Sequence, residues 1–392
     1  MALETGQGSY QGRGQNVAKR NFANVKTEQE EDMFKKISEG FVYKALKGGK
    51  VACGPRAAIC KDGSIVCSYM VQTKISQNDF VPMVAYSKDG ESWGGAKPIW
   101  PDWVGVKSPF VSVRNTPDGK VSVAGMFFEI DGEGEMFWSN EAMGMKENKL
   151  CWCVSQDGVE FGSPSVIELP YYASAEQPGG MLVKRDGEII MIYAPYDTIK
   201  KKQAVETGKL IKMASKDGGK TFEAGVVGKI DVDSNFAESW IVELGNGKVF
   251  VSSWLPNSEN APDVCFISHD GGESFSEPID MKIGGQSTAL APFGEDKVLV
   301  AYNQRAIGTI GVWLALGEPK DDEFELIANE PVWEATAKTR SNKSEDFDNW
   351  TDYSFGEPNV TILEDNSLLV VFWCQQPDEC GIKYVRLQMQ ED

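Results

Sequence analysis

Short apolar runs separated by tight polar turns recur along most of the chain. Six segments share one pattern, an apolar run, a turn of Asp, Asn and Gly residues, and a second apolar run: AAICKDGSIVCSYM, VSVRNTPDGKVSVAGMFF, GMLVKRDGEIIMIYA, WIVELGNGKVFVSSW, ALAPFGEDKVLVAYN and VTILEDNSLLVVFW. This pattern is typical of β-hairpins. The hairpins recur every 45 to 65 residues or so, a spacing of roughly one propeller blade.

A second element follows four of these hairpins. It is a further strand that ends in a polar loop, as in VAYSKDGESW, CWCVSQDGVEF, IKMASKDGGKTF and CFISHDGGESF. In such a loop the Asp side chain accepts hydrogen bonds from the amides of its own turn, and Gly takes a positive φ. Four loops of one kind, each after a similar hairpin, predict an all-β fold, a six-bladed β-propeller.

The repeats assign blades to residues of about 50–100, 105–170, 174–233, 235–283, 284–336 and 352–390. The last unit has only three obvious strands, whereas FVYKAL at 41–46 is a spare strand. We expect this N-terminal strand to pair beside 380–390 and to complete blade six, which leaves no open gap in the ring. Residues 1–35 are predicted to form an N-terminal arm, in which only EQEEDMFKKI has helical character, and residues 36–392 form one domain.

Charge narrows the range of partners. The net charge is −19 and no Lys/Arg-rich run occurs, so nucleic acid and anionic membranes would be repelled. No stretch of 18 apolar residues is present and the N-terminus is polar, which predicts a soluble chain, cytoplasmic or secreted with a signal peptide absent from this chain. An anionic ligand would need arginines placed locally in its pocket.

Metal chemistry is not expected from the cysteine pattern. Of eight cysteines, five lie inside apolar strand-like runs, and His269 is the single histidine. We therefore interpret the cysteines as reduced, buried thiols. A Cys/His zinc site is not predicted, nor is any other cofactor.

Candidate chemistry lies at the start of each hairpin. The innermost strand of a propeller blade begins at one mouth of the central channel, so side chains before the turns should face a shared pocket. Glu238 and Glu357 each lie eight residues before the turn of their hairpin. Two close carboxyls shift each other's pKa values apart, which suits acid and base roles. Polar residues also precede three other turns, namely Arg56, Glu176 and Gln286.

The polar loops resemble the Asp-box of sialidases, Ser/Thr-x-Asp-x-Gly-x-Thr-Trp/Phe. Ser215–Phe222 and Ser268–Phe275 fit this motif, and Ser87–Trp93 and Ser155–Phe161 are one residue short. From about residue 50 to 390 the chain is similar to the sialidase superfamily. The resemblance implies an exo-acting glycoside hydrolase, with sialic acid or a related acidic sugar as the first substrate to consider.

The resemblance also implies roles for four residues. Arg56, in Gly-Pro-Arg-Ala-Ala, matches the arginine that binds the substrate carboxylate at the start of blade one, and Arg305 in YNQRAIG matches a second such arginine. Asp79, in QTKISQND, matches the general acid/base. Glu238 matches the glutamate that assists the nucleophile.

Two departures leave alternatives open. Blade four has no arginine in VSSWLPNSENAPDVCF, so the arginine triad of the family is incomplete. Where the family has a nucleophilic tyrosine, this chain has Glu357, and Tyr353 lies four residues earlier. Sialidases use a tyrosine nucleophile, whereas most glycosidases use two carboxyls. The nucleophile is therefore Tyr353 or Glu357.

Two further functions fit the same residues. A glutamate nucleophile would suit a neutral glycan such as arabinan, with Glu176 and Glu238 as an alternative pair, and the propeller could also bind glycans without catalysis. Four aromatic residues are candidates for stacking on sugars: Trp240, Tyr302, Trp350 and Tyr353. Catalysis requires Asp79, Glu238 and Arg305 to converge in one pocket.

Overall fold

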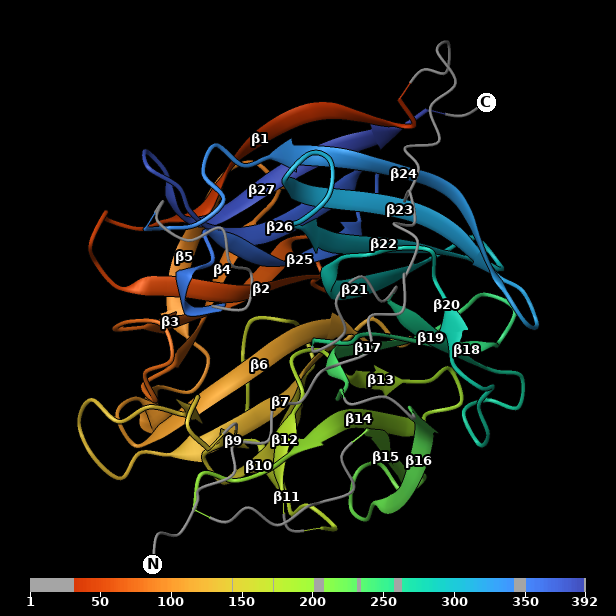
Figure 1. The fold of residues 1–392 in the computed structure, drawn as a ribbon, viewed down its shortest axis with the longest axis horizontal. Helices are drawn as coiled ribbons and strands as arrows, with labels where there is room; N and C mark the ends of the chain where they lie inside the picture. The colour runs from red at the N-terminus through yellow and green to blue at the C-terminus, as the bar shows by residue number, and fades with distance from the viewer. Residues whose placement is uncertain are drawn as a thin grey trace, which may run out of the picture.

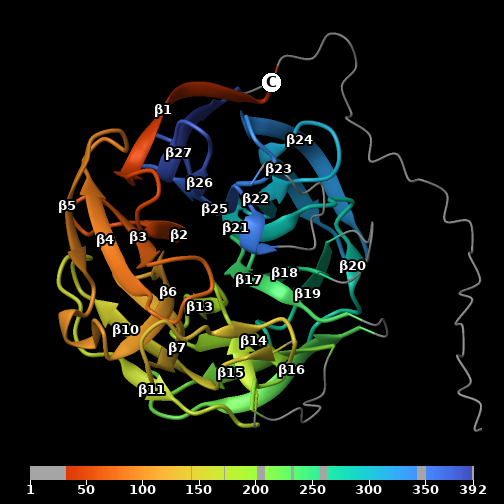
Figure 2. The ribbon, with the colours of Figure 1, turned by 60° about the vertical axis from the view of Figure 1, so that its left-hand side comes forward.

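The computed structural model describes residues 32–142, 144–171, 173–200, 208–230, 234–256, 263–341 and 350–390. These residues form β-strands, turns and two short 3₁₀ helices, η1 (Pro101–Trp103) and η2 (Trp350–Asp352). Six small antiparallel sheets lie in a ring (Figure 1), and Figure 2 shows them arranged around one axis. The predicted six-bladed β-propeller is confirmed.

Blades one to three follow the order of the chain, and each has its innermost strand first. Blade one contains β2 (Val51–Ile59), β3 (Ile65–Gln72), β4 (Val81–Ser87) and β5 (Trp93–Pro98). Blade two contains β6 (Lys107–Asn115), β7 (Val121–Glu129), β10 (Asn148–Ser155) and β11 (Ser165–Ile167), with a small hairpin of β8 (Trp138–Ser139) and β9 (Gly144–Met145) between β7 and β10. Blade three contains β12 (Ser174–Glu176) and β13 (Met181–Val183), which both pair with β14 (Ile189–Tyr196), then β15 (Lys209–Ser215) and β16 (Glu223–Lys229).

Blades four to six complete the ring. Blade four contains β17 (Ala237–Glu243), β18 (Val249–Trp254), β19 (Val264–Ser268) and β20 (Ile279–Asp280). Blade five contains β21 (Gln286–Phe293), β22 (Lys297–Gln304), β23 (Gly311–Pro319) and β24 (Phe324–Glu334). Blade six contains β25 (Phe355–Ile362), β26 (Leu368–Gln375), β27 (Cys380–Met389) and, as its outer strand, β1 (Phe34–Lys44).

The N-terminal strand β1 pairs antiparallel with the C-terminal strand β27. Its register places Phe41 opposite Lys383 and Phe34 opposite Met389. The strand therefore begins before the predicted 41–46, inside the predicted arm. For residues 34–37 the helical prediction is wrong, because Phe34 packs into the core beside blades five and six. The part of that segment before residue 32 lies outside the described residues.

The four Ser-x-Asp loops share one set of hydrogen bonds. In each loop the serine hydroxyl donates to the Asp Oδ1 two residues later, at 2.7–3.0 Å. In the two longer loops Oδ1 accepts the backbone N–H four residues beyond Asp, and in the two shorter loops it accepts the N–H three residues beyond. The glycine three residues before the aromatic residue has a φ of 74–96° in all four loops; these are Gly90, Gly158, Gly219 and Gly272. The two shorter loops therefore close one residue earlier, but the same Asp oxygen accepts the closing hydrogen bond in all four.

Hydrophobic clusters fill the space between neighbouring blades. The largest fully buried side chains include Tyr69, Tyr193, Tyr302 and Phe372, from blades one, three, five and six. The eight cysteines are unpaired, and six of them are buried, which agrees with their interpretation as buried thiols. In the described part of the chain, no helix has the length and apolar character to cross a membrane.

Candidate functional site

The innermost strands of four blades bulge at the same place. Each strand loses register with its hairpin partner there, and the first residue of the bulge has a positive φ. These four residues are Gly54 in β2 (57°), Glu238 in β17 (48°), Ser287 in β21 (58°) and Glu357 in β25 (50°). A positive φ is costly for a residue other than glycine, and bulges often turn a side chain towards a functional site.

The bulges correct part of the sequence reasoning. Glu238 and Glu357 are structurally equivalent, as their equal offset indicates. In blade five the equivalent residue is Ser287, one position after Gln286: the first pair beyond the bulge is Ala289 with Ala301 there, as it is Trp240 with Ser252 in blade four. In blade one it is Gly54, two positions before Arg56. A side chain at Gly54 would meet Met70 and Phe110 at 2.5 and 2.6 Å, so this bulge requires glycine.

Carboxylates from one blade accept the bulge amides of the next. The Gly54 N–H donates to Glu357 Oε2 at 2.9 Å, and the Glu238 N–H donates to Glu176 Oε2 at 3.0 Å. Arg56 Nη1 donates to the Glu357 carbonyl at 3.0 Å. Blade six is thus joined to blade one, and blade three to blade four, at the point where the acidic side chains meet.

The Glu238 carboxylate has side-chain donors on two blades. Trp254 Nε1, at the end of β18, donates to Glu238 Oε2 at 2.6 Å. Ser287 Oγ, from the blade-five bulge, donates to the same oxygen at 2.5 Å. Side chains of blades four and five thus hold one oxygen of Glu238.

Arg305 joins blades five and six. It directly follows β22, and its two terminal nitrogens donate to the Gln286 side chain and the Phe355 carbonyl. The guanidinium lies 4.0 Å from the centre of the Tyr353 ring. Gln286 Nε2 is 3.4 Å from the Tyr353 hydroxyl. Tyr353, Gln286 and Arg305 therefore form one contact group.

Burial and mutual repulsion shift the pKa values of two acids upward. Burial, followed by the charge of Glu238, raises the pKa of Glu176 well above its usual value. The same two causes raise the pKa of Glu357 to about 7, against the opposing effects of Arg56, the Gly54 amide and Arg305. Close carboxyls with unlike protonation are typical of acid/base sites.

Burial also lowers the pKa values of three arginines around these acids. It does so for Arg56 and Arg305, both partly compensated by Glu238 and Glu357. Burial together with the charge of Arg56 lowers the pKa of Arg114 to about 9. With a pKa of about 9, the Arg114 guanidinium is still charged at neutral pH. Arginine side chains in general are charged at that pH.

Asp79 lies in the loop between β3 and β4. Its carboxylate accepts hydrogen bonds from the Thr73 N–H at 3.1 Å and from Gln77 Nε2 at 2.9 Å, both within the same loop. Across the described ranges, no hydrogen bond or ion pair is recorded between Asp79 and the group around Glu238. Six other predicted site residues do lie together, which are Arg56, Glu176, Glu238, Gln286, Arg305 and Glu357. Tyr353 lies against Arg305.

For two aromatic residues, the predicted role in stacking on sugars is wrong. Trp240 is 2% exposed, with its ring 5.1 and 5.0 Å from the guanidiniums of Arg56 and Arg114. Tyr302 is 1% exposed and lies against Trp313. Each ring is covered by neighbouring blades, which a single strand sequence does not reveal. The side chain of Trp350 lies outside the described residues.

Sequence reasoning missed three residues of the site. Ser287 could have been found by counting back from Glu295, the centre of its hairpin turn, and not from Asp296. Trp254 ends an apolar run, which by itself indicates a core residue, yet it is half-buried and its indole N–H reaches Glu238. Arg114 has no sequence signal, since it lies in the one innermost strand, β6, that pairs without a shift in register.

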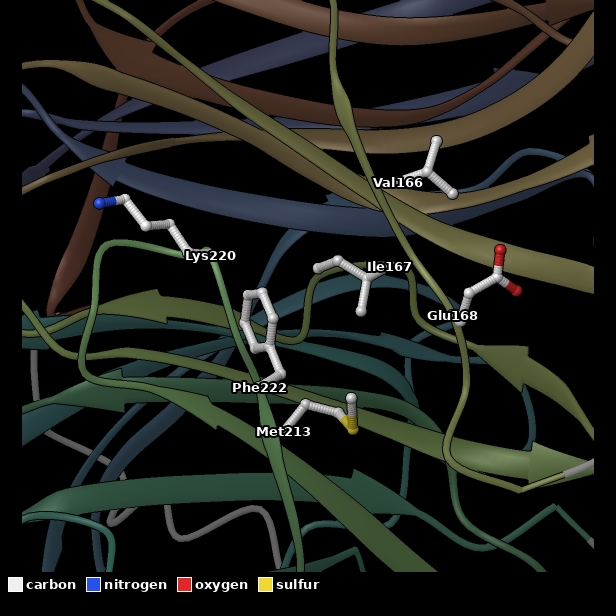
Figure 3. A pocket seen from close by; sticks show the side chains of 7 residues that line it. Val166, Ile167, Glu168, Met213, Lys220 and Phe222 are labelled. Atoms are coloured by element: carbon white, nitrogen blue, oxygen red, sulfur yellow. The ribbon is translucent and has the colours of Figure 1, made fainter.

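Other features of the surface are separate from this site. A depression between blades two and three, at the loop 215–222, is lined by Val166, Ile167, Glu168, Met213, Gly219, Lys220 and Phe222 (Figure 3). It contains none of the predicted site residues. Among the residues with described positions, no group of three His, Cys, Asp or Glu side chains is arranged to hold a metal ion.

Known protein structures share this architecture, although no family model and no curated protein sequence matches the chain. A protein of unknown function from Dyadobacter fermentans is similar in structure, with a TM-score of 0.68 and 18% identity over 91% of this chain and 100% of that one.

Two sialidase-type structures are also similar. The NanB sialidase of Streptococcus pneumoniae has a TM-score of 0.59 and 12% identity, over 89% of this chain and 70% of that one. The intramolecular trans-sialidase of Ruminococcus gnavus has a TM-score of 0.61 and 11% identity, over 90% of this chain and 98% of that one. At these identities the likeness concerns the fold alone: the chain is a six-bladed β-propeller, similar in architecture to these two structures.

Proposed function

We propose that this protein is a sialidase-like glycoside hydrolase that removes a terminal sugar carrying a negative charge. The observation that carries the proposal is the charge balance where the blades meet. Three arginines, Arg56, Arg114 and Arg305, stand against three carboxyls, of which Glu176 and Glu357 have raised pKa values. Near pH 7 this region has more positive than negative charge, inside a chain of net charge −19. Such a site favours an anionic ligand.

The two predicted carboxylate-binding arginines take different roles in this proposal. Both terminal nitrogens of Arg305 already have protein partners, so Arg305 contributes its charge and its contact with Tyr353. Arg56 uses Nη1 for backbone carbonyls, and within the described residues no partner is recorded for its Nη2. Arg56 is therefore the proposed direct ligand of the sugar carboxylate.

Bond cleavage then follows the tyrosine route of sialidases. The Tyr353 oxygen attacks the anomeric carbon and loses its proton to Glu238, the glycosidic C–O bond breaks, and Asp79 gives its proton to the leaving oxygen. Water then attacks the anomeric carbon and gives a proton to Asp79, while the bond between the sugar and the Tyr353 oxygen breaks and Glu238 returns its proton to that oxygen. The Arg305 guanidinium against the ring supports the route, because a nearby cation stabilises charge that develops on the phenol oxygen.

A panel of aryl glycosides, with acidic and neutral sugars matched in their leaving group, tests this function. We expect turnover of the acidic sugar. Arg56→Lys should lower kcat/KM on that substrate by about tenfold or more, because lysine cannot make the planar two-point contact, and should have little effect on a neutral one. Equal losses on both substrates would contradict the proposed carboxylate contact. If the wild-type protein turns over no glycoside, the hydrolase proposal fails.

One observation favours a second candidate, hydrolysis of a neutral glycan by paired carboxyls. Glu238 and Glu357 lie at equivalent bulges, and the charge of Glu238 helps to raise the pKa of Glu357. In that reaction Glu357 is the proton donor and Glu238 the ionised partner. The two candidates differ in one variant: Tyr353→Phe should abolish the tyrosine route but leave the carboxyl route largely active.

The proposed acid/base role of Asp79 has its own test. Asn at this position can still accept the Thr73 N–H through its side-chain oxygen, so Asp79→Asn should keep the loop and the thermal stability. Removal of a general acid typically costs about 10²- to 10⁴-fold in rate. The loss should be smaller for substrates with a good leaving group, which need less protonation. An unchanged kcat on a poor leaving group would remove Asp79 from the mechanism.

A further inference from the structure

We propose that Trp254 and Ser287 are positioning residues that hold Glu238 as the charged member of the carboxyl cluster that it forms with Glu176 and Glu357. The inference rests on the proposed function and deepens it, because both reactions described above use Glu238 in its ionised form. It assigns a role to two residues that make no contact with the sugar in the reaction described above.

The contacts on Glu238 differ from those on the other two acids. Both Trp254 Nε1 and Ser287 Oγ are neutral donors, and both bind Glu238 Oε2. The Glu357 and Glu176 carboxylates each accept one backbone N–H, that of Gly54 and that of Glu238. A carboxylate with more donors keeps its negative charge more readily. The three carboxylates therefore differ in the hydrogen-bond donors that they have, and this difference does not depend on how deeply each is buried.

The fold holds both donors in place. Ser287 lies in the blade-five bulge with a φ of 58°, is 7% exposed, and has Oγ directed across the blade boundary. Trp254 ends β18, the strand that pairs with β17 next to Glu238. The backbone N–H of Glu238 is bound to Glu176 on the opposite side. Glu238 is thus fixed by blades three, four and five, which explains why a glutamate is retained at a positive φ.

Other charged groups surround Glu238 and limit the size of the effect. The charge of Glu238 acts on six titratable groups, which come from six elements and their ends: Arg56, Glu176, Tyr196, Asp263, Arg305 and Glu357. Since these groups are the same in a Trp254 or Ser287 variant, a change in such a variant reports the missing donor.

The test measures protonation directly in the substrate-free protein. Carbon-13 NMR of glutamate labelled at Cδ follows each carboxyl through a pH titration, with Glu238 and Glu357 assigned from the Gln variants. In the wild type we expect Glu238 to become charged at lower pH than Glu357. Trp254→Phe and Ser287→Ala should each move the Glu238 midpoint upward by about one pH unit, and the double variant by about two.

Matched controls remove a similar group nearby. Ser239→Ala deletes a hydroxyl that binds Ser253, next to Glu238 in sequence, and Trp313→Phe deletes an indole N–H that binds the Thr309 carbonyl. Both should leave the Glu238 midpoint unchanged. If the double variant does not fold, Ser287→Gly, which suits the positive φ, gives the same test for one donor.

The outcomes separate this inference from the proposed function. Upward shifts in the variants, with the acid limb of the pH dependence of kcat/KM moving by the same amount, support both. Upward shifts in a protein that turns over no glycoside support the positioning role and reject the hydrolase. A Glu238 midpoint that stays in place in both single variants overturns the positioning role, whatever the activity.

Discussion

Glu357 couples the protonation of the site to the stability of the fold. Burial and the nearby Glu238 raise its pKa to about 7. The folded protein therefore binds this proton more tightly than the unfolded chain, whose glutamate has a pKa near 4.3 or so. Between these two values the folded state holds more protons, so its stability falls as the pH rises, and the contribution is constant outside that window.

Glu357→Gln should remove this dependence. Because glutamine does not titrate, the variant should gain stability relative to wild type as the pH increases from about 4.5 to 7, by at most about 3 kcal/mol. Chemical denaturation of both proteins across this range measures the difference. Glu364→Gln, at an exposed position one residue after Leu363 in the same hairpin, should run parallel to wild type. A constant difference between Glu357→Gln and wild type would contradict the raised pKa.

At the scale of elements, each Ser-x-Asp loop packs against the neighbouring blade. In the loop 215–222 of blade three, Gly218 and Gly219 have φ values of 74° and 81°. A Cβ on Gly219 would lie 1.9 Å from Cζ2 of Trp152 in β10 of blade two, whereas a Cβ on Gly218 would meet nothing within 4 Å. Adjacent glycines thus share one backbone strain but differ in their contact with the next blade.

The glycine pair separates the cost of φ from the cost of blade packing. Gly218→Ala should lower the free energy of unfolding by about 1 kcal/mol, the cost of a left-handed alanine. Gly219→Ala should lower it by about 3 kcal/mol or more, because Trp152 must also move. Urea denaturation of the two variants gives both values. Equal losses would mean that this loop does not support the contact between blades two and three.

For the whole molecule, the pairing of β1 with β27 brings the first and the last described strands into one blade (Figure 1). Val42 in β1 is 7% exposed and belongs to the core cluster that also contains residues of blades one and two. Phe34, eight residues earlier, packs into the cluster of blades five and six. One outer strand therefore contacts cores on both sides of the closing blade.

Disruption of this strand should destabilise the ring as a unit. Val42→Asp buries an unpaired carboxylate and should cost about 3 kcal/mol or more, with one cooperative transition at lower temperature. Leu46→Asp makes the same chemical change two residues beyond the strand, at a side chain that is 84% exposed, and should leave the melting temperature nearly unchanged. Similar melting temperatures for both variants would show that closure does not depend on β1.

The number of blades follows from the sequence because hairpins and Ser-x-Asp loops are local. A hairpin or an Asp-capped loop is stabilised by contacts within about ten residues of the chain. Each can therefore be predicted from its own segment of sequence. The equal offset of Glu238 and Glu357 has the same origin, since both precede their turns by a fixed number of strand residues.

Contacts between blades were decided by the tertiary structure alone. Phe34 is a strand residue because its partner, Met389, lies at the other end of the chain. Trp240 is covered by arginines of two other blades, and the two terminal nitrogens of Arg305 donate to groups of blades five and six. Ser287 and Trp254 reach Glu238 only once blades four and five are packed together. Which side chains are buried, paired or charged depends on neighbours distant in sequence, and local patterns carry no information about them.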